Sequence, residues 1–323
     1  MNKGARNTII ALSALVAVSA VAAYGLSRMV VDMAIKRDAK LLSVPQKLQN
    51  KITGGLASDP NLKTVAETYK EILKLPTETV TVKSRDGLQL TGHLYKSENQ
   101  RRVVIAMHGW RSSWEFDFGS VVEFYNGLGC TVIYADQRGQ NNSDGEYIGF
   151  GILERHDCVS WIEYAASRFG KDVPIYLLGV SMGASTVLMS TGLELPEQVK
   201  GVVADCGFTS PKEIWHHVVN NNLRLNSKIS YPIINRIVKR LASFEGDEYS
   251  TLDAMETNTR PILFIHGSAD NFVPLKMSVD NYLACKAPKD LLIVPGAGHG
   301  MSYLTDKCAY ERAVKRFFRS IET

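Results

Sequence analysis

Runs of apolar residues alternate with amphipathic stretches along most of this chain. Six mostly apolar runs are long enough to be buried strands: residues 103–107, 131–135, 175–180, 199–204, 262–265 and 291–294. They are too continuous to have one wet face, and helical patterns separate them. This arrangement predicts a parallel sheet covered by helices on both faces. The last segment agrees, because its apolar residues recur at helical spacing: Tyr310, Ala313, Val314, Phe317, Phe318 and Ile321.

An antiparallel hairpin is expected ahead of the parallel strands. Residues 80–82 and 88–95 are strand-like and flank Asp86-Gly87, a pair typical of a tight turn. The predicted architecture is therefore an α/β domain with a mostly parallel sheet and an antiparallel N-terminal hairpin.

The alternation of strand and helix patterns is interrupted between about residues 209 and 258. Two helical patterns replace the strands there, around residues 214–219 and 233–244. We interpret this interval as a small helical cap inserted over the sheet. The apolar face of its second helix, which carries Ile237 and Leu241, is expected to line a substrate pocket.

The first part of the chain differs in composition from a globular domain. Residues 8–27 carry no charge and lie between Arg6 and Arg28. Twenty helical residues span about 30 Å, the hydrocarbon thickness of a bilayer. We expect residues 1–31 to be a single anchor in a bacterial cell membrane. A cleaved signal, with a cleavage site near Ala20-Val21-Ala22, and a buried soluble helix remain alternatives. Basic residues flank both ends, so the positive-inside rule does not orient the protein.

Two further segments follow this anchor or signal. Residues 32–77 are mostly polar, with a short helical period in Val65, Tyr69, Ile72 and Leu73, and are interpreted as a stalk or packing arm. Residues 78–323 form the main domain with its cap insertion, a length that suits one large α/β domain.

Composition excludes several classes of protein. Hydrophobic residues make up 45% and charged residues 22% of the chain, so neither a disordered nor a multi-span membrane protein is indicated. The net charge is only +4, and the basic residues are dispersed, which disfavours a nucleic-acid partner. The five cysteines are widely spaced without a Cys-x-x-Cys pair, so we expect buried free thiols and no metal site.

A candidate nucleophile lies at Ser181. Gly179-Val180-Ser181-Met182-Gly183 fits the G-x-S-x-G pattern, which alone is a weak signal because it is short. Its context strengthens it, since an apolar strand precedes it and a small-residue helical pattern follows. A strand-to-helix turn this tight forces an unfavourable backbone at the serine, and Gly179 and Gly183 allow the chain segments to approach.

An oxyanion hole needs two backbone donors beside such a serine. The amide of Met182, at the start of the new helix, would be one. The other is expected from Trp110, because the strand at 103–107 runs directly into His108-Gly109-Trp110 and Gly109 would permit an unusual turn. His108 is interpreted as a residue that bonds the backbone of this loop.

The base and the acid are expected later in the chain. Asp270 follows the strand at 262–265, and His299 follows the strand at 291–294 within a glycine-rich loop. The carboxyl ends of parallel strands meet at one edge of a sheet, so both would lie near Ser181. A serine needs a neighbouring imidazole to take its proton, and the imidazole needs a carboxylate to orient it. Asp205 is the rival acid, and Asp136 is interpreted as a loop-fixing residue.

These residues resemble bacterial α/β-hydrolases of the serine aminopeptidase S33 type, a group that includes monoglyceride lipases. The resemblance extends over about residues 79–321 and is carried by these positions: His108-Gly109-Trp110, Asp136 with Arg138-Gly139 and Ser143, the turn at Ser181, Asp270 with Val273-Pro274, and His299 with Met301-Ser302-Tyr303. The chain looks similar to membrane-anchored hydrolases of Gram-positive bacteria. The order Ser, Asp, His also matches the superfamily, so the resemblance implies the α/β-hydrolase fold. Asn141-Asn142 departs from the pattern, which usually has a glycine before the serine, but asparagine tolerates left-handed backbone.

The sequence thus predicts a serine hydrolase with Ser181, Asp270 and His299 as the triad. Cleavage of a small carboxylic ester through an acyl-enzyme is the leading hypothesis. An exopeptidase or amidase acting on a short peptide is the alternative, and would need a cap carboxylate to hold the substrate amine. A tethered binding protein without turnover is a third reading. No cofactor motif is present, so none is expected.

Overall fold

The computed structural model describes residues 24–39, 45–224 and 226–322. Eight strands form one sheet in the order β1-β2-β4-β3-β5-β6-β7-β8. The pairs β1–β2 and β2–β4 are antiparallel, and all other pairs are parallel. The strands are β1 (Glu78–Lys83), β2 (Gln89–Tyr95), β3 (Arg102–Met107), β4 (Cys130–Ala135), β5 (Ile175–Val180), β6 (Val199–Asp205), β7 (Ile262–Gly267) and β8 (Lys289–Val294). The predicted hairpin and mostly parallel sheet are confirmed.

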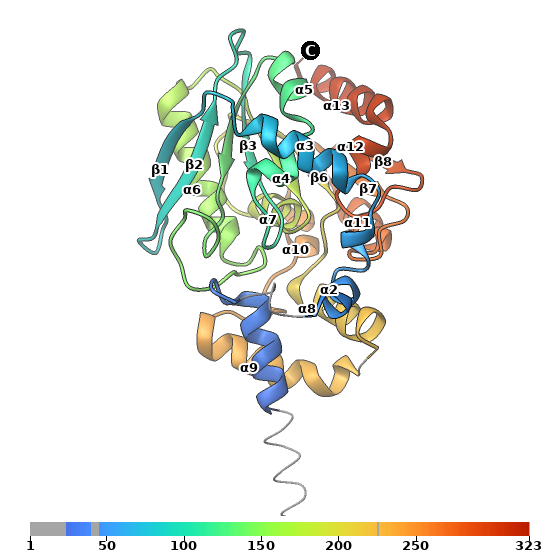
Figure 1. Ribbon diagram of the computed structural model, residues 1–323. Coiled ribbons are helices and arrows are strands. Elements are labelled where there is room, and N and C mark those ends of the chain that lie inside the picture. Colours follow the sequence, from blue (N-terminus) through green and yellow to red (C-terminus); the bar gives the residue numbers. More distant parts are fainter. Residues whose placement is uncertain (1–23, 40–44, 225, 323) are drawn as a thin grey trace, which may run out of the picture.

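Helices cover both faces of this sheet, as the continuous apolar runs predicted (Figure 1). One face is covered by α6 (Glu154–Phe169), α7 (Met182–Ser190), α10 (Thr251–Thr257) and α11 (Leu275–Ala284). The other face is covered by α4 (Trp114–Phe118), α5 (Val122–Gly127) and α13 (Lys307–Glu322), with α12 (Ser302–Thr305) before it. The predicted apolar stripe of α13 is buried from Tyr310 to Phe318.

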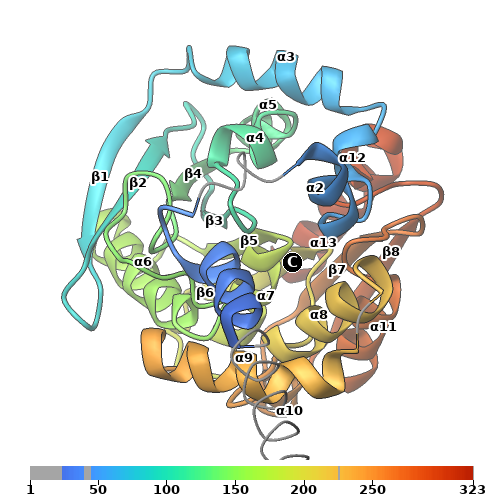
Figure 2. The same ribbon diagram turned by 60° about the horizontal axis from the view of Figure 1, so that its bottom comes forward.

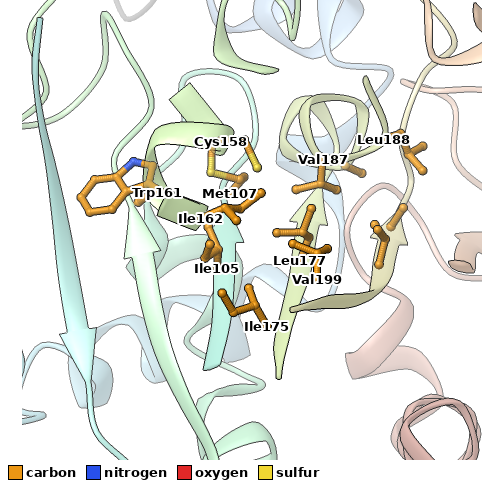
Figure 3. Close-up of a cluster of buried hydrophobic side chains, with 14 of the residues drawn as sticks. Ile105, Met107, Cys158, Trp161, Ile162, Ile175, Leu177, Val187, Leu188 and Val199 are labelled. Carbon is orange, nitrogen blue, oxygen red and sulfur yellow. The ribbon is translucent and has the colours of Figure 1, made fainter. Parts of the chain in front are cut away.

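The central strands are buried on both faces. In Figure 3, Ile162 of α6 lies beside Ile105 and Met107 of β3, and Val187 of α7 lies beside Leu177 of β5. All six residues of β3 and of β4 are buried. β8 differs from the expectation of a continuously buried run, because it is the edge strand and Ile293 is 41% exposed.

The N-terminal region begins with a helix over residues 24–35 that packs onto the cap. Val31 and Ile35 are buried in the same hydrophobic cluster as Ile237 and Val238. The helix lies beside α9 (Ser227–Ala242) in both views (Figures 1 and 2). Residues 1–23 of the predicted anchor or signal lie outside the described residues. None of the helices that the structure describes is long and apolar enough to cross a membrane. Membrane attachment therefore stays a prediction.

The expected packing arm contains three short elements on the surface of the main domain. They are α2 (Gln46–Ile52), the 3-10 helix η2 (Leu56–Ser58) and α3 (Leu62–Ile72). Val65 and Ile72 of α3 are buried, and the Thr68 hydroxyl lies 3.1 Å from that of Ser120 beside α4. The described part of the arm that contains α3 is thus packed on the domain.

The interval interpreted as the cap contains α8 (Pro211–His217), the π-helix η3 (Val218–Asn222), α9 and α10. Ile214 of α8 and Ile234, Ile237 and Val238 of α9 are buried against the helix at residues 24–35. The helix α10 instead packs on α7 and α11 of the main domain.

All five cysteines are free thiols in the structure. Cys130, Cys158, Cys206 and Cys285 are buried, as expected. The expectation was wrong for Cys308, which is exposed because it lies on the outer side of α13, away from the apolar stripe.

Candidate active site

Ser181 lies at a sharp turn between β5 and α7. Its backbone has φ 55° and ψ −118°, a conformation that costs free energy for a residue with a side chain. The turn is possible because neither flanking glycine has a Cβ: at Gly183 it would overlap the carbonyl oxygen of Met107, and at Gly179 the carbonyl of Gly183. The Ser181 amide also donates to the Asp205 carbonyl at 2.8 Å. The predicted strain and both predicted glycine roles are therefore present.

The structure brings Ser181, His299 and Asp270 into one hydrogen-bonded chain. Ser181 Oγ lies 2.8 Å from His299 Nε2, and His299 Nδ1 lies 2.7 Å from Asp270 Oδ2. A carboxylate accepts, so the proton on Nδ1 donates to Asp270 and Nε2 is left to accept from the serine. This is the geometry needed to deprotonate the hydroxyl.

Asp270 is held in place by the loop that follows it. Its Oδ1 accepts from the amides of Phe272 and Val273, both at 2.9 Å. Its Oδ2 also lies 3.2 Å from Nε2 of His266, a fully buried residue. No motif in the sequence indicated His266, although it stands four residues before Asp270 in a buried strand.

Charge coupling shifts the pKa values of the acid and the base in opposite directions. Burial alone would raise the pKa of Asp270, but the His299 charge and hydrogen bonds from both histidines hold it well below its usual range. Burial alone would lower the pKa of His299, but the charge of Asp270 and the neighbouring Cys206 outweigh it and raise the pKa well above 6.5. The acid thus stays ionised at neutral pH.

This coupling predicts how kcat/KM falls at low pH in any reaction that uses His299 as a base. The base must be neutral, so kcat/KM should fall as pH is lowered through the raised pKa of His299, with a midpoint above 6.5. Asp270→Asn removes the charge that raises this pKa and should move the midpoint of residual activity to lower pH. A kcat/KM profile between pH 5 and 10 measures both midpoints. A wild-type midpoint at or below 6.5 would contradict the coupling.

The two expected oxyanion donors flank the serine. Among the residues that the structure describes, neither the Trp110 nor the Met182 backbone N–H donates to another protein group. Gly109 was predicted to permit an unusual turn, but the structure requires a glycine there for a different reason. The left-handed residue of this loop is Arg111, with φ 51°, whereas a Cβ at Gly109 would lie 3.3 Å from that of Ser181. Gly109 therefore allows a close approach.

The loop at residues 109–111 is bound by the N-terminal helix. The indole Nε1 of Trp110 donates to the Ala34 carbonyl at 2.7 Å. The Arg111 guanidinium donates to the carbonyls of Met33 at 3.0 Å and Lys36 at 2.6 Å, at the end of that helix. Arg111 was missed by sequence reasoning because its partners are backbone carbonyls, which carry no sequence signal.

His108 has the predicted role of fixing the loop. It is fully buried, its Nδ1 donates to the Gly109 carbonyl at 2.8 Å, and its Nε2 accepts from the Gln137 amide at 3.1 Å. Asn141 adopts φ 49°, the left-handed backbone expected where the family has a glycine.

The two other aspartates considered as acids do not contact His299. The Asp205 carboxyl accepts from the Ser302 hydroxyl at 3.1 Å, and burial raises its pKa to about 7. Asp136 accepts from the backbone and side-chain N–H groups of Asn142, at 3.2 and 3.0 Å, and thus fixes the loop as predicted.

A cavity of about 420 Å³ opens beside Ser181 and His299. The arm supplies part of its wall through Thr53, Leu56, Val65 and Tyr69. No described residue between 207 and 258 lines it. The expectation that Ile237 and Leu241 line the pocket was wrong, because the helix at residues 24–35 occupies the apolar face of α9.

One group of side chains has metal-ligand character. The ligand atoms of Cys206, Asp270 and His299 lie within 4.8 Å of one another. Asp270 and His299 already hydrogen-bond each other. His299 also bonds Ser181, and Asp270 also accepts from the Phe272 amide, so the geometry is that of a hydrogen-bonded triad.

Comparison with known proteins agrees with this architecture. Residues 98–251 match the family model described as serine aminopeptidase, S33. The chain has the α/β-hydrolase fold. It is 24% identical over 253 residues to Bacillus subtilis YqkD, described as uncharacterized, covering 78% of this chain and 82% of the relative. Escherichia coli YfhR, also described as uncharacterized, is 25% identical over 228 residues, or 69% of this chain and 73% of that protein.

Solved structures share this fold. An esterase from Pyrococcus furiosus superposes with a TM-score of 0.64 at 19% identity, covering 78% of this chain and 93% of the esterase. An acylaminoacyl peptidase from Pyrococcus horikoshii superposes with a TM-score of 0.53 at 18% identity, covering 82% of this chain and 43% of the peptidase. The family match supports a hydrolase and does not identify the bond that it would cleave.

Proposed function

We propose that the protein is a serine hydrolase that cleaves carboxylic esters through an acyl-enzyme. The observation that carries this proposal is the chain of hydrogen bonds from Ser181 Oγ through His299 to Asp270, at 2.8 and 2.7 Å. The strained serine backbone and the two unpaired amides beside it add the remaining parts of an acyl-transfer site.

Each residue has one role in the proposed reaction. Ser181 Oγ attacks the ester carbonyl carbon while its proton passes to His299 Nε2. The oxyanion that forms accepts hydrogen bonds from the amides of Trp110 and Met182. The tetrahedral intermediate then breaks its bond to the alcohol oxygen, which leaves with the proton from His299. Water attacks the acyl-enzyme by the same route, and the carboxylic acid departs from a restored Ser181.

Asp270 supports both halves of this cycle. Its charge stabilises the imidazolium that forms each time His299 holds a proton, and its hydrogen bond keeps Nε2 aimed at the serine. His266 and the amides of Phe272 and Val273 keep the carboxylate in place.

The carboxylates around the site favour an ester over a peptide with a free amino terminus. An exopeptidase needs an ionised carboxylate in reach of the substrate amine. The cap acids Glu213, Glu245, Asp247 and Glu248 do not line the cavity, and Glu245 and Asp247 already pair with lysines. Asp117 and Asp205 do line it, but burial raises the pKa of both carboxyls. The oxygens of Asp117 accept from the Gly109 amide and the Ser112 hydroxyl, and Asp205 accepts from the Ser302 hydroxyl.

Parallel assays of an ester and an aminoacyl anilide test the proposal. Wild-type protein should hydrolyse p-nitrophenyl acetate and butyrate, and should cleave an aminoacyl p-nitroanilide far more slowly. A fluorophosphonate probe should label it, and Ser181→Ala should abolish both labelling and turnover. Faster cleavage of the anilide would make the protein an exopeptidase. Labelling without turnover of either substrate would favour a binding protein, and full labelling of Ser181→Ala would remove Ser181 as nucleophile.

A further inference from the structure

The cavity beside Ser181 extends to the side of the sheet that carries α13. Its lining includes Val180, just before the serine, and Val121 at the start of α5. It also includes Leu304 of α12 and Tyr310 of α13. All four residues belong to or pack against the hydrophobic core of that face. The cavity therefore opens into this core, and no described residue of the cap lines it; we call this part of the cavity, around Val121, Leu304 and Tyr310, the slot.

The N-terminal arm closes the outer side of this slot. Val65 and Tyr69 of α3 face it, and Val65 is only 4% exposed. The arm is fixed to both loops of the triad. A Cβ at Gly54 would meet the Asn271 backbone at 2.5 Å, and one at Gly298 would meet the Asp59 carboxylate at 2.5 Å. Asn271 adjoins Asp270, and Gly298 adjoins His299. The arm that forms the slot wall therefore contacts the two loops that carry the candidate acid and base.

The chemistry of the slot changes along its length. Most of the lining area is apolar, with Leu56, Val65 and Leu304 among its aliphatic residues, and this favours an apolar group that leaves water. The deeply buried part of the lining contains polar groups. They are Asp205, which accepts from Ser302, and the Tyr310 hydroxyl, 3.4 Å from that of Tyr125. An apolar chain gains free energy along the walls but gains none from reaching these polar groups.

We propose that this slot, walled by α3, α4, α12 and α13 together with Val121, binds the acyl group of the substrate, and that the cap does not. This inference rests on the proposed function, because it places the acyl half of an ester bound at Ser181. The substrates are then esters of unbranched, apolar acyl groups longer than acetate. Val121 and Tyr69 set the selectivity, although Tyr69 belongs to a segment more than 100 residues before the serine in sequence.

Chain-length selectivity distinguishes the slot from the cap. The measured quantity is kcat/KM for p-nitrophenyl acetate, butyrate, hexanoate and octanoate. In wild-type protein each added methylene should raise kcat/KM by up to about fourfold, the gain expected for burying one such group, until the chain meets the polar end. Val121→Phe fills the slot and should lower the hexanoate-to-acetate ratio at least tenfold. Tyr69→Ala removes part of the wall and should lower the same ratio.

Leu241→Ala on the cap is the matched control, because it removes apolar volume from a residue outside the slot. It should leave the hexanoate-to-acetate ratio within twofold of wild type. A changed ratio in Leu241→Ala, with unchanged ratios in the two slot variants, would overturn the proposal. Uniform loss on all esters in both slot variants would also overturn it. If Val121→Phe does not fold, Tyr69→Ala decides, since this side chain is only half-buried on a surface helix. Failure of the proposed function is seen separately, as the absence of wild-type acetate hydrolysis and of Ser181 labelling.

Discussion

Asp270→Asn should lower kcat about ten-thousandfold, while Asp205→Asn should cause a much smaller loss. An asparagine in place of the acid of a triad favours the wrong imidazole tautomer and removes the charge that stabilises the imidazolium. In this protein the carboxylate of Asp270 is the one bonded to His299 Nδ1, at 2.7 Å. The Asp205 carboxyl bonds to Ser302 instead, and its raised pKa of about 7 means that a neutral amide resembles one of its natural states.

Steady-state kinetics on p-nitrophenyl butyrate measure both losses, with thermal unfolding as a check that each variant is folded. His299→Ala should match or exceed the loss in Asp270→Asn, because the three residues act as one unit. Equal losses of kcat in Asp270→Asn and Asp205→Asn would contradict the assignment of Asp270 as the acid.

Arg111→Ala should lower kcat/KM about a hundredfold through kcat. Arg111 has a left-handed backbone, follows the expected donor Trp110, and binds the carbonyls of Met33 and Lys36. Without the guanidinium, the loop can relax and carry the Trp110 amide away from the oxyanion. Loss of one oxyanion donor costs about a hundredfold to a thousandfold in kcat. KM should change far less, since Arg111 acts on the transition state through the loop.

Two variants separate a positioning role from a general loss of stability. Arg111→Lys keeps a charged donor that can reach one carbonyl, so it should recover part of kcat. Arg312→Ala on α13 is the matched arginine control and should retain wild-type kinetics. Removal of residues 1–36 takes away the carbonyl partners and should reproduce the kcat loss of Arg111→Ala. A wild-type kcat in Arg111→Ala would show that the loop keeps its shape without the helix.

The arm and the helix at residues 24–35 both contribute to the candidate active site. The helix at residues 24–35 accepts hydrogen bonds from the loop at residues 109–111, and α3 forms part of the cavity wall. A truncation that keeps only the main domain from residue 78 would retain the triad and lose both contributions. Loss of activity in such a truncation would therefore not argue against Ser181 as the nucleophile.

The sequence alone determined the features whose cause is local or periodic. Continuous apolar runs require burial on both faces, so the parallel strands could be placed within a residue or two. The turn at Ser181 depends on five consecutive residues, and both glycines are required by sterics within that turn and with Met107. Asp270 and His299 could be placed near Ser181 because residues after parallel strands meet at one edge of the sheet. The left-handed backbone at Asn141 followed from residue type.

Only the tertiary structure decided which segments cover the site. The apolar face of α9 could pack on the substrate or on another helix, and its periodicity is the same in both cases. The helix at residues 24–35 occupies that face, which leaves the pocket wall to Val65 and Tyr69. The contacts of Arg111 were equally hidden, because every residue has a backbone carbonyl and only the fold brings particular carbonyls within reach. Long-range packing and backbone acceptors leave no pattern in the amino-acid sequence. In this protein they shape the pocket and hold the loop at residues 109–111.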